Sequence, residues 1–457
     1  MLRVLLKPFQ KFLHLQAASS ALLLLATVVA LIWANLPGGS DYEAFWQTPL
    51  SLSFGAFQIS HSLQFWINEG LMSLFFLVVG LEIKRELLVG ELSSPRQASL
   101  PILGALGGMA IPAAIYVLLN PPGSLYANGW AIPTVTDIAF TVGALTLLGN
   151  RVPIGLKVFL IALAIVDDIG AILVIALFYS HGLQPLFLGL AAATILVAVL
   201  INKAGENKPW PYLLLGGPLW LALLKSGIHP TIAGVLLAFT VPASAKIDPC
   251  AFHQQSLNVL YRLKQTGLQC QTTVMLTNAD YQDNVQALDT LCEEVQAPLQ
   301  RMEHALHPWV TYGILPLFAL ANAGVQLPWG HFSTALGQPL TLGIIAGLFL
   351  GKPIGITLAA WAAVRAGWAK LPEHVSWRQI HAAGILSGIG FTMSVFITLL
   401  AFQEPKQVSF AKLGILLASG LSAIVGVALL RLSLGNPLPT GVITNSEADL
   451  EVEIDPD

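Results

Sequence analysis

Long apolar runs separated by short polar segments dominate this chain up to about residue 431. A membrane-spanning helix needs about 20 predominantly apolar residues. By that measure the sequence predicts twelve spans, centred near residues 24, 75, 108, 139, 167, 193, 217, 235, 316, 351, 389 and 420. Helical periodicity adds little, because spanning helices are apolar on most of their faces. The pattern therefore predicts an all-α polytopic membrane protein.

The composition excludes one large soluble domain. Of the 457 residues, 55% are hydrophobic and only 10% are charged, whereas soluble domains carry about 25% charged residues. The formal net charge of −3 argues against a nucleic acid as partner. We expect no cofactor.

The placement of Lys and Arg predicts the orientation, because short cytoplasmic loops carry an excess of basic residues. With the N-terminus in the cytoplasm, 18 of the 22 basic residues fall inside. Lys225, Lys406 and Lys412 fall outside, and Lys352 lies within a span. We therefore expect both termini in the cytoplasm. The basic residues assigned to the cytoplasm are Arg3, Lys7, Lys11, Lys84, Arg85, Arg96, Arg151, Lys157, Lys203, Lys208, Lys246, Arg262, Lys264, Arg301, Arg365, Lys370, Arg378 and Arg431.

The polar segments divide the chain into four regions. Residues 1–242 hold spans one to eight, and the first apolar run (15–33) is interpreted as a span because no clear signal-peptide cleavage site follows it. Partial alternation near residues 45–60, with Gly55 at its midpoint, predicts a short extracytoplasmic β-hairpin. Residues 243–300 form a polar insert, residues 301–431 hold spans nine to twelve, and residues 432–457 form an acidic tail, which we expect to be disordered.

The insert is predicted to be partly helical. Val285, Leu288, Leu291 and Val295 recur at helical spacing, and a further helix can start near Pro298. The helix either rests on the membrane face or on its neighbours, or it is a regulatory docking element. The insert also holds all three cysteines, which we expect to be reduced thiols; their spacing relative to His253 does not favour a metal site. The cysteines are Cys250, Cys270 and Cys292.

Two spans are predicted to be interrupted. In the fourth, Pro133 removes a backbone donor, and Thr136 and Asp137 follow where their side chains can bond to freed backbone groups. The eleventh contains Gly384, Gly388 and Gly390 within seven residues. Paired interruptions of this kind are typical of transporters with inverted repeats, where two unwound segments face each other and form an ion site.

Carboxylates inside apolar runs are the main candidates for chemistry. Asp167 and Asp168 stand side by side near the centre of the fifth span, where each charge costs roughly 2.5–3.5 kcal/mol. Adjacent carboxylates raise each other's pKa, which prepares them to exchange protons for a cation such as Na+ or Li+. Asp137 lies at similar depth, and Lys352 is the one basic residue there. Because successive helical residues are about 100° apart, one aspartate can meet the cation while its neighbour faces Lys352.

A purely structural interpretation remains open for some of these residues. Asp137 and Lys352 can form buried pairs that lock helices or compensate helix ends. One lysine cannot neutralise both Asp167 and Asp168, so that interpretation explains the pair poorly.

Other charged residues lie nearer the membrane surfaces. Glu69 is interpreted as a solvated or capping acid rather than a relay, and His229, near Lys225, as a surface histidine rather than a pH-responsive one. A cluster on the cytoplasmic rim is either a set of interfacial salt bridges or a titrating group that controls access to the site. The cluster consists of Glu82, Lys84, Arg85, Glu86, Glu303, His304 and His307.

These motifs resemble those of the bacterial NhaA-type Na+/H+ antiporters, over nearly the whole chain except residues 243–300 and the tail. The matching segments are Phe76-Leu-Val-Val-Gly-Leu-Glu82-Ile-Lys-Arg85-Glu86-Leu, Gly129-Trp-Ala-Ile-Pro-Thr-Val-Thr136-Asp137-Ile-Ala-Phe, Leu163-Ala-Ile-Val-Asp167-Asp168-Ile-Gly-Ala-Ile, His307-Pro-Trp-Val, Gly351-Lys352-Pro-Ile-Gly-Ile and Gly388-Ile-Gly390-Phe-Thr-Met-Ser394.

The resemblance implies twelve helices with inverted repeats, whose fourth and eleventh members cross at unwound segments. It implies an ion and proton site at Asp167 and Asp168, beside Asp137 and Thr136, with Lys352 as the partner of Asp167. It assigns pH sensing to Glu82, Arg85, Glu86, Glu303, His304, His307 and His229, and the dimer contact to the hairpin. The insert, longer than in the shortest family members, directly precedes Glu303.

From these observations we expect an electrogenic, pH-regulated antiporter of the bacterial inner membrane that exports Na+ or Li+ for about two H+. We expect no enzymatic activity. An intramembrane aspartyl protease also needs two acids on neighbouring spans, but such enzymes resemble one another in a Gly-x-Gly-Asp motif that this chain lacks. A passive cation channel is the other alternative, and its flux would not be coupled to protons.

Overall fold

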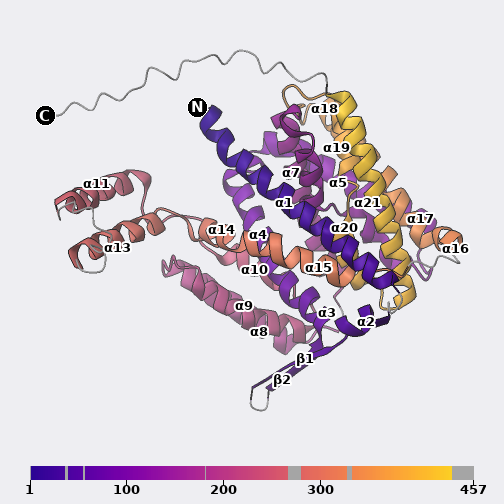
Figure 1. The fold of residues 1–457 in the computed structure, drawn as a ribbon, viewed down its shortest axis with the longest axis horizontal. Coiled ribbons are helices and arrows are strands. Elements are labelled where there is room, and N and C mark those ends of the chain that lie inside the picture. Colours follow the sequence, from indigo (N-terminus) through magenta and orange to yellow (C-terminus); the bar gives the residue numbers. More distant parts are fainter. Residues whose placement is uncertain are drawn as a thin grey trace.

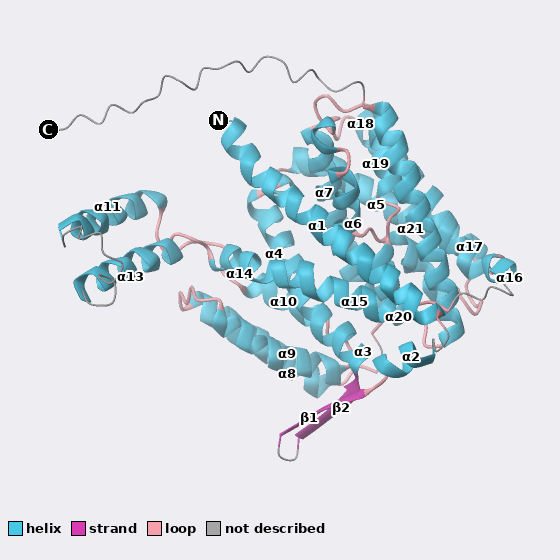
Figure 2. Ribbon diagram, in the orientation of Figure 1, coloured by secondary structure: helices cyan, strands magenta, loops and turns pink. Residues whose placement is uncertain are grey.

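The computed structural model describes residues 2–36, 40–54, 57–180, 182–265, 279–326 and 332–434. Helices dominate these residues, and the sheet found among them is a single two-stranded hairpin (Figure 2). The tail from residue 435, Gly55 and Cys270 lie outside the described residues.

The elements follow one another along the chain in the order shown in Figure 1. They are α1 (Leu2–Asn35), α2 (Ser40–Trp46), β1 (Pro49–Phe54), β2 (Phe57–Ser62), α3 (Leu63–Phe65), η1 (Trp66–Leu71), α4 (Met72–Val89), η2 (Glu91–Ser93), α5 (Pro95–Leu119), η3 (Ala127–Thr134), α6 (Ile138–Thr146), η4 (Gly149–Arg151), α7 (Ile154–Phe178), α8 (Pro185–Lys203), α9 (Trp210–Ser226), α10 (Ile232–Thr240), α11 (Pro249–Gln265), α13 (Ala279–Glu294), α14 (Pro298–Trp309), η5 (Val310–Ile314), α15 (Leu315–Asn322), α16 (Phe332–Leu336), α17 (Pro339–Ile345), η7 (Ala346–Gly351), α18 (Lys352–Arg365), α19 (Trp377–Leu386), α20 (Phe391–Ala401) and α21 (Pro405–Ser433).

Within the described residues, seven helices are long and apolar enough to cross a membrane, or eight if the bent pair α19–α20 is one span. The protein is therefore a multi-pass membrane protein. The other predicted centres, near residues 139, 217, 235 and 316, lie in α6, α9, α10 and α15, which have 9, 17, 9 and 8 residues. Each of these four helices is shorter than the length of about 20 residues that a span needs, so twelve spans remain a prediction.

The hairpin follows α2 at one end of the bundle (Figure 1). Its strands pair antiparallel from Pro49↔Ser62 to Phe54↔Phe57, so a hairpin forms where the alternation predicted one. The predicted start at residue 45 was wrong, because α2 extends to Trp46. We call this side of the molecule the hairpin end.

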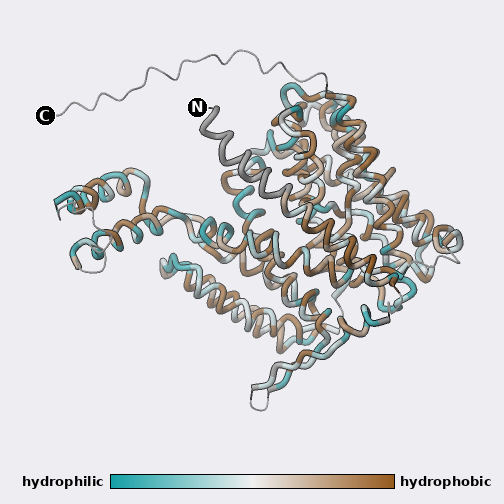
Figure 3. Tube along the Cα trace, in the orientation of Figure 1, coloured by the Kyte–Doolittle hydropathy of each residue, from teal (hydrophilic) through white to brown (hydrophobic). Residues whose placement is uncertain are grey.

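The opposite side, which we call the insert end, carries α11 and α13. These two helices extend away from the bundle (Figure 1), and their traces mix hydrophilic and hydrophobic residues more than those of the bundle helices (Figure 3). Ion pairs Lys246–Glu294 and Arg301–Glu293 join α13 to the segments before α11 and at the start of α14. The helix expected near Pro298 is α14.

Among the described residues, three π-helical turns interrupt otherwise regular helices. They are η1 before α4, η5 between α14 and α15, and η7 immediately before Lys352. Single π-helical turns inside α-helices are rare and occur frequently at functional sites.

Glycines bring α5 and α18 into direct backbone contact. A Cβ atom built on Gly107 would lie 2.3 Å from the carbonyl oxygen of Gly355, and one on Gly355 would lie 2.1 Å from that of Gly107. Small residues at such interfaces let membrane helices approach closely. This contact fixes the start of α18, where Lys352 lies.

Candidate functional site

The fourth span changes conformation at its midpoint. The 3-10 segment η3 contains Pro133 and ends at Thr134, and α6 begins at Ile138. Asp137 caps α6, because its Oδ1 accepts a hydrogen bond from the backbone N–H of Phe140 at 3.1 Å. Thr136 and Asp137 therefore lie in a short non-helical segment in the protein interior, with 0% and 2% of their surface exposed.

A second interruption separates α19 from α20, whose axes bend by 49°. The two interruptions contact each other: the backbone N–H of Asp137 donates to the carbonyl oxygen of Ile389 at 2.7 Å. Two glycines lie close to neighbouring backbone here, Gly390 to the fourth span and Gly388 to η7. A Cβ atom on Gly390 would lie 3.2 Å from the carbonyl oxygen of Val135, and one on Gly388 would lie 2.4 Å from that of Leu348.

Asp167 belongs to a buried network with Thr136 and Lys352. The Nζ of Lys352 donates to Asp167 Oδ2 and, at 2.8 Å, to the Thr136 hydroxyl. That hydroxyl lies 2.7 Å from Asp167 Oδ2 and 2.9 Å from the carbonyl oxygen of Ser387, and its one proton can serve either acceptor. Asp167 and Lys352 both have 0% exposure, so the ion pair is shielded from water.

Asp168 faces a different environment. It lines a cavity of about 60 Å³ together with Asp137 and Thr392. Its Oδ1 is buried and, like that of Asp167, has no hydrogen-bond partner within the described part of the chain. A buried carboxylate oxygen without a donor is costly, so this position favours a proton or a cation.

Asp137, on the same cavity, is held mainly by α20. Its Oδ2 accepts hydrogen bonds from the backbone N–H of Thr392, at 2.9 Å, and from the Thr392 hydroxyl. Sequence reasoning missed Thr392 and the carbonyl group of Ser387. The motif around Gly390 contains Thr392, but local sequence does not show that it meets a residue 255 positions away.

The cavity extends to the insert end, where Glu82 and His307 line it. Arg85 lies 3.4 Å from Glu86 and 3.5 Å from Glu303, so these predicted rim residues come together. His304 is more peripheral: it is exposed, and its Nδ1 lies 3.2 Å from the carbonyl oxygen of Gln300 in its own helix.

Glu303 and His307 lie on the polar helix α14, before the apolar segment that starts at Val310. Burial raises the pKa of the Glu303 carboxyl, and the positive charges of Arg85 and His304 oppose that rise. Burial also lowers the pKa of His307, and His304 and Arg85 lower it further.

The Asp137 carboxylate and the Thr392 hydroxyl line the same cavity as Asp168. Oxygen atoms of these kinds are hard ligands, which Na+ and Li+ favour. Among the residues described, no three His, Cys, Asp or Glu side chains are grouped to hold a metal ion.

Comparison with known proteins identifies the family. The family model described as Na+/H+ antiporter 1 matches residues 10–430. The chain belongs to this Na+/H+ antiporter family.

Similar members of the family cover nearly the whole chain. The Na(+)/H(+) antiporter NhaA of Oleidesulfovibrio alaskensis is 49% identical over 433 residues, which are 94% of this chain and 95% of the relative. The Na(+)/H(+) antiporter NhaA of Rhodospirillum rubrum is 46% identical over 437 residues, with 94% and 99% covered. A solved sodium proton antiporter, MjNhaP1 from Methanocaldococcus jannaschii, aligns with a TM-score of 0.43 and 16% identity, covering 94% of this chain and 100% of that one.

At the hairpin end of this antiporter-family chain, Glu69 lies 3.7 Å from His229. Of the two alternatives for Glu69, a solvated or a capping acid, the solvated one was wrong, because the side chain is only 13% exposed. The backbone carbonyl oxygen of Glu69 accepts hydrogen bonds from Ser73 and, at 2.8 Å, from Trp220. Lys225 instead lies over the ring of Phe187, 5.8 Å from its centroid.

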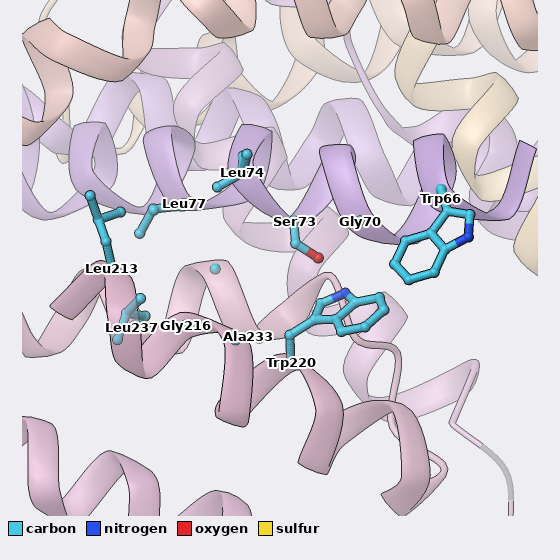
Figure 4. Close-up of a pocket in the computed structure, with 12 residues that line it drawn as sticks. Trp66, Gly70, Ser73, Leu74, Leu77, Leu213, Gly216, Trp220, Ala233 and Leu237 are labelled. Atoms are coloured by element: carbon cyan, nitrogen blue, oxygen red, sulfur yellow. The ribbon is translucent and has the colours of Figure 1, made fainter. Parts of the chain in front are cut away.

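A larger cavity, of about 210 Å³, lies between α4, α9 and α10 (Figure 4). The rings of Trp66 and Trp220 stack beside it with centroids 5.9 Å apart. Its lining is apolar except for Ser73 and holds no charged residue. It therefore lacks the groups needed for ion exchange, and the smaller cavity at Asp168 is the candidate site.

Proposed function

We propose that this protein is an electrogenic antiporter that exports Na+ or Li+ and admits about two H+ in return. Membership of the Na+/H+ antiporter 1 family supports this function. The observation that carries it is Asp168, a carboxylate that is 1% exposed, lacks a partner at Oδ1 and lines the cavity that extends to the insert end.

In this proposal Asp168 holds either a proton or the exported cation. Both compensate the same negative charge, and the low polarity around the site prevents the carboxylate from remaining charged and unpaired. The Asp137 carboxylate and the Thr392 hydroxyl lie on the same cavity and supply further oxygen ligands. Because proton and cation compete for one place, uptake of one requires release of the other.

Asp167 supplies the second exchangeable proton, and Lys352 compensates its charge when that proton leaves. Thr136 connects both side chains to the crossing of the interrupted spans. Two protons exchanged for one monovalent cation move one net charge per cycle. Each such charge contributes roughly 2.3 kcal/mol per 100 mV, so a membrane potential that is negative inside drives cation export.

We assign the insert end and both termini to the cytoplasm of a bacterial cell, because basic residues concentrate there. The part of the cavity lined by Glu82 and His307 then lies towards the cytoplasm. We further propose that twelve spans form inverted repeats around the crossing of the interrupted spans, and that the site opens alternately to the two sides of the membrane about this crossing. We also propose that the rim residues control the pH dependence and that two copies form a homodimer through the hairpin.

Purified protein reconstituted into liposomes tests the function. We expect an imposed Na+ gradient to drive proton movement in the opposite direction, reported by a pH-sensitive dye, and an imposed K+–valinomycin potential to change its rate. Proton movement that ignores the potential would show that exchange is electroneutral. Na+ flux without any proton movement would show that the protein is a channel.

A further inference from the structure

We propose that the side-chain amides of Asn68 and Asn322 form a second cation-binding station at the hairpin end, on the release side of the route from Asp168. Three phenylalanines, Phe76, Phe318 and Phe396, close the route between the two stations in this conformation. This inference rests on the proposed antiport and names residues of its outward half.

Two continuous helical segments outline the route. One consists of η1 and α4, and the other of α14, η5 and α15. At the insert end their side chains line the cavity, with Glu82 and Val79 from the first segment and His307 and Thr311 from the second. The same two segments therefore accompany the cavity and continue past it towards the hairpin.

The closure lies where the cavity lining ends. The ring centroids of Phe76 and Phe396 are 5.4 Å apart, and those of Phe318 and Phe396 are 6.3 Å apart. None of the three side chains is more than 2% exposed. Hydrocarbon rings packed without water offer no ligand to a small cation that has lost its hydration shell, so they form an apolar barrier.

The amides lie one to two turns beyond these rings. Asn322 Nδ2 donates to Asn68 Oδ1 at 2.7 Å and to the carbonyl oxygen of Phe318 at 3.0 Å. Asn322 Oδ1 accepts from Gln64 Nε2 at 3.0 Å and from Asn68 Nδ2 at 3.3 Å. Gln64 Oε1 in turn accepts from Nε2 of the exposed Gln47 beside the hairpin. The amides therefore connect the buried barrier to the outer surface.

The chemistry of this cluster suits release. Asn322 is 0% exposed, yet its carbonyl oxygen is a hard ligand that Na+ accepts. The three amides carry no net charge, so they hold a cation more weakly than the carboxylates do, and a site that must let its ion leave needs weak binding. While no ion is present, the amides satisfy one another.

The π-helical turns lie at both positions where movement would open the route. Asn68 lies in η1, and η5 precedes Phe318 by less than two turns. Local rearrangement of such turns changes the direction of the side chains that follow. The same amide cluster could simply hold two helices together, so the test must separate transport from packing.

A role in transport and a role in packing can be distinguished by measuring the KM for Na+ separately from each side of the membrane. We expect Asn322→Leu, which keeps the size and removes the oxygen, to raise the KM for Na+ offered from the hairpin side roughly tenfold. The KM for Na+ offered from the insert side should change less than about twofold. Exchange is measured in proteoliposomes sorted into the two orientations.

Asn35→Leu is the matched control. Asn35 also holds two segments together at the hairpin end, by a hydrogen bond of 2.8 Å from α1 to the carbonyl oxygen of Val325 after α15, whereas the Asn68–Asn322 pair bonds to Gln64 and to the carbonyl oxygen of Phe318. Equal changes in both KM values for Asn322→Leu would overturn the proposal and leave the amides a packing role. If that variant fails to fold, Asn68→Leu, at a half-buried position, provides the same measurement.

Failure of the underlying antiport would give a different result. Wild-type protein would then show no Na+-driven proton movement in either orientation, and the comparison of variants would not arise.

Discussion

Near the midpoint of α7, the carboxylates of Asp167 and Asp168 lie on different sides of the helix and have different surroundings. On one side Asp167 meets a lysine and a hydroxyl, all fully buried. On the other side Asp168 lines a cavity. Each acid keeps one buried oxygen, Oδ1, without a hydrogen-bond partner among the described residues, so the difference lies in the lysine and hydroxyl at Oδ2 of Asp167. Adjacent residues of a helix point about 100° apart, so one short motif supplies both a compensated and an uncompensated charge. In the proposed exchange both acids release a proton: Lys352 compensates the charge left on Asp167, whereas the cation compensates the charge left on Asp168.

The largest expected effect comes from the uncompensated side. Asp168→Asn should lower Na+-driven proton movement in inverted vesicles at least about 100-fold, because an amide neither binds nor releases a proton in this pH range. Near-normal exchange in this variant would contradict the assignment of Asp168.

The free energy of unfolding should depend more on Lys352 than on Asp168, although transport should depend most on Asp168. Lys352→Met leaves the Asp167 charge buried without its partner, which typically costs about 3–5 kcal/mol. Asp168→Asn should cost less than about 1 kcal/mol or stabilise the fold, because it removes an unpaired buried carboxylate. Thermal unfolding of the purified variants in one detergent measures both.

Asp167→Asn combined with Lys352→Met serves as the control for that experiment. The double variant should be more stable than Lys352→Met alone, because no unpaired charge remains. If the two variants unfold at the same temperature, Lys352 does not stabilise Asp167.

A smaller effect should follow from Thr136→Val, which keeps the shape and removes the hydroxyl shared by Asp167 and Lys352. We expect the KM for Na+ to rise by about tenfold at most. Thr146→Val is the matched control, because the hydrogen bond of the Thr146 hydroxyl within the described residues goes to the carbonyl oxygen of Gly143 in its own helix. Similar KM changes in both variants would argue against a role for Thr136 at the site.

The smallest expected effect concerns the rim of the cavity that Asp168 shares. Arg85 lowers the pKa of Glu303 and of His307, so Arg85→Ala should raise both, and each group should keep its proton to a higher pH. If deprotonation of the rim activates transport, the rising limb of the activity profile should move to higher pH by less than about one unit, because Arg85 is partly exposed.

Activity measured across pH in proteoliposomes checks this direction. Arg96→Ala is the control, because Arg96 is an exposed arginine of α5 near the same end. The absence of a shift would exclude Arg85 from pH control, and a shift to lower pH would contradict its effect through the pKa of Glu303 and His307.

Local sequence rules were sufficient to find the acids and the hairpin. Asp167 and Asp168 interrupt an apolar run, and alternation with a central glycine marked the strands. Position along the chain does not show which face of α7 meets which neighbour, so the sequence alone could not distinguish the surroundings of the two acids. Their geometry depends on contacts between residues far apart in the chain.

Sequence reasoning missed several contacts of the site for the same reason, because they join residues that are far apart in the chain. Thr136 bonds to the carbonyl oxygen of Ser387, 251 positions away, and Asn68 meets Asn322 at a separation of 254. Asn322 stands at the end of an apolar run, which was a usable signal, but nothing local identifies its partner. The π-helical turns were also not predicted, because their composition resembles that of ordinary membrane helices.

The direct contact between Gly107 and Gly355 limits how the site can vary. A methyl group at either position would force the two helix axes apart, since the space is occupied by a carbonyl oxygen 2.1–2.3 Å away. Lys352 begins the same helix as Gly355, so such a displacement would withdraw its ammonium group from the acid that it neutralises. Two residues without side chains thus determine where the deepest positive charge of the site lies.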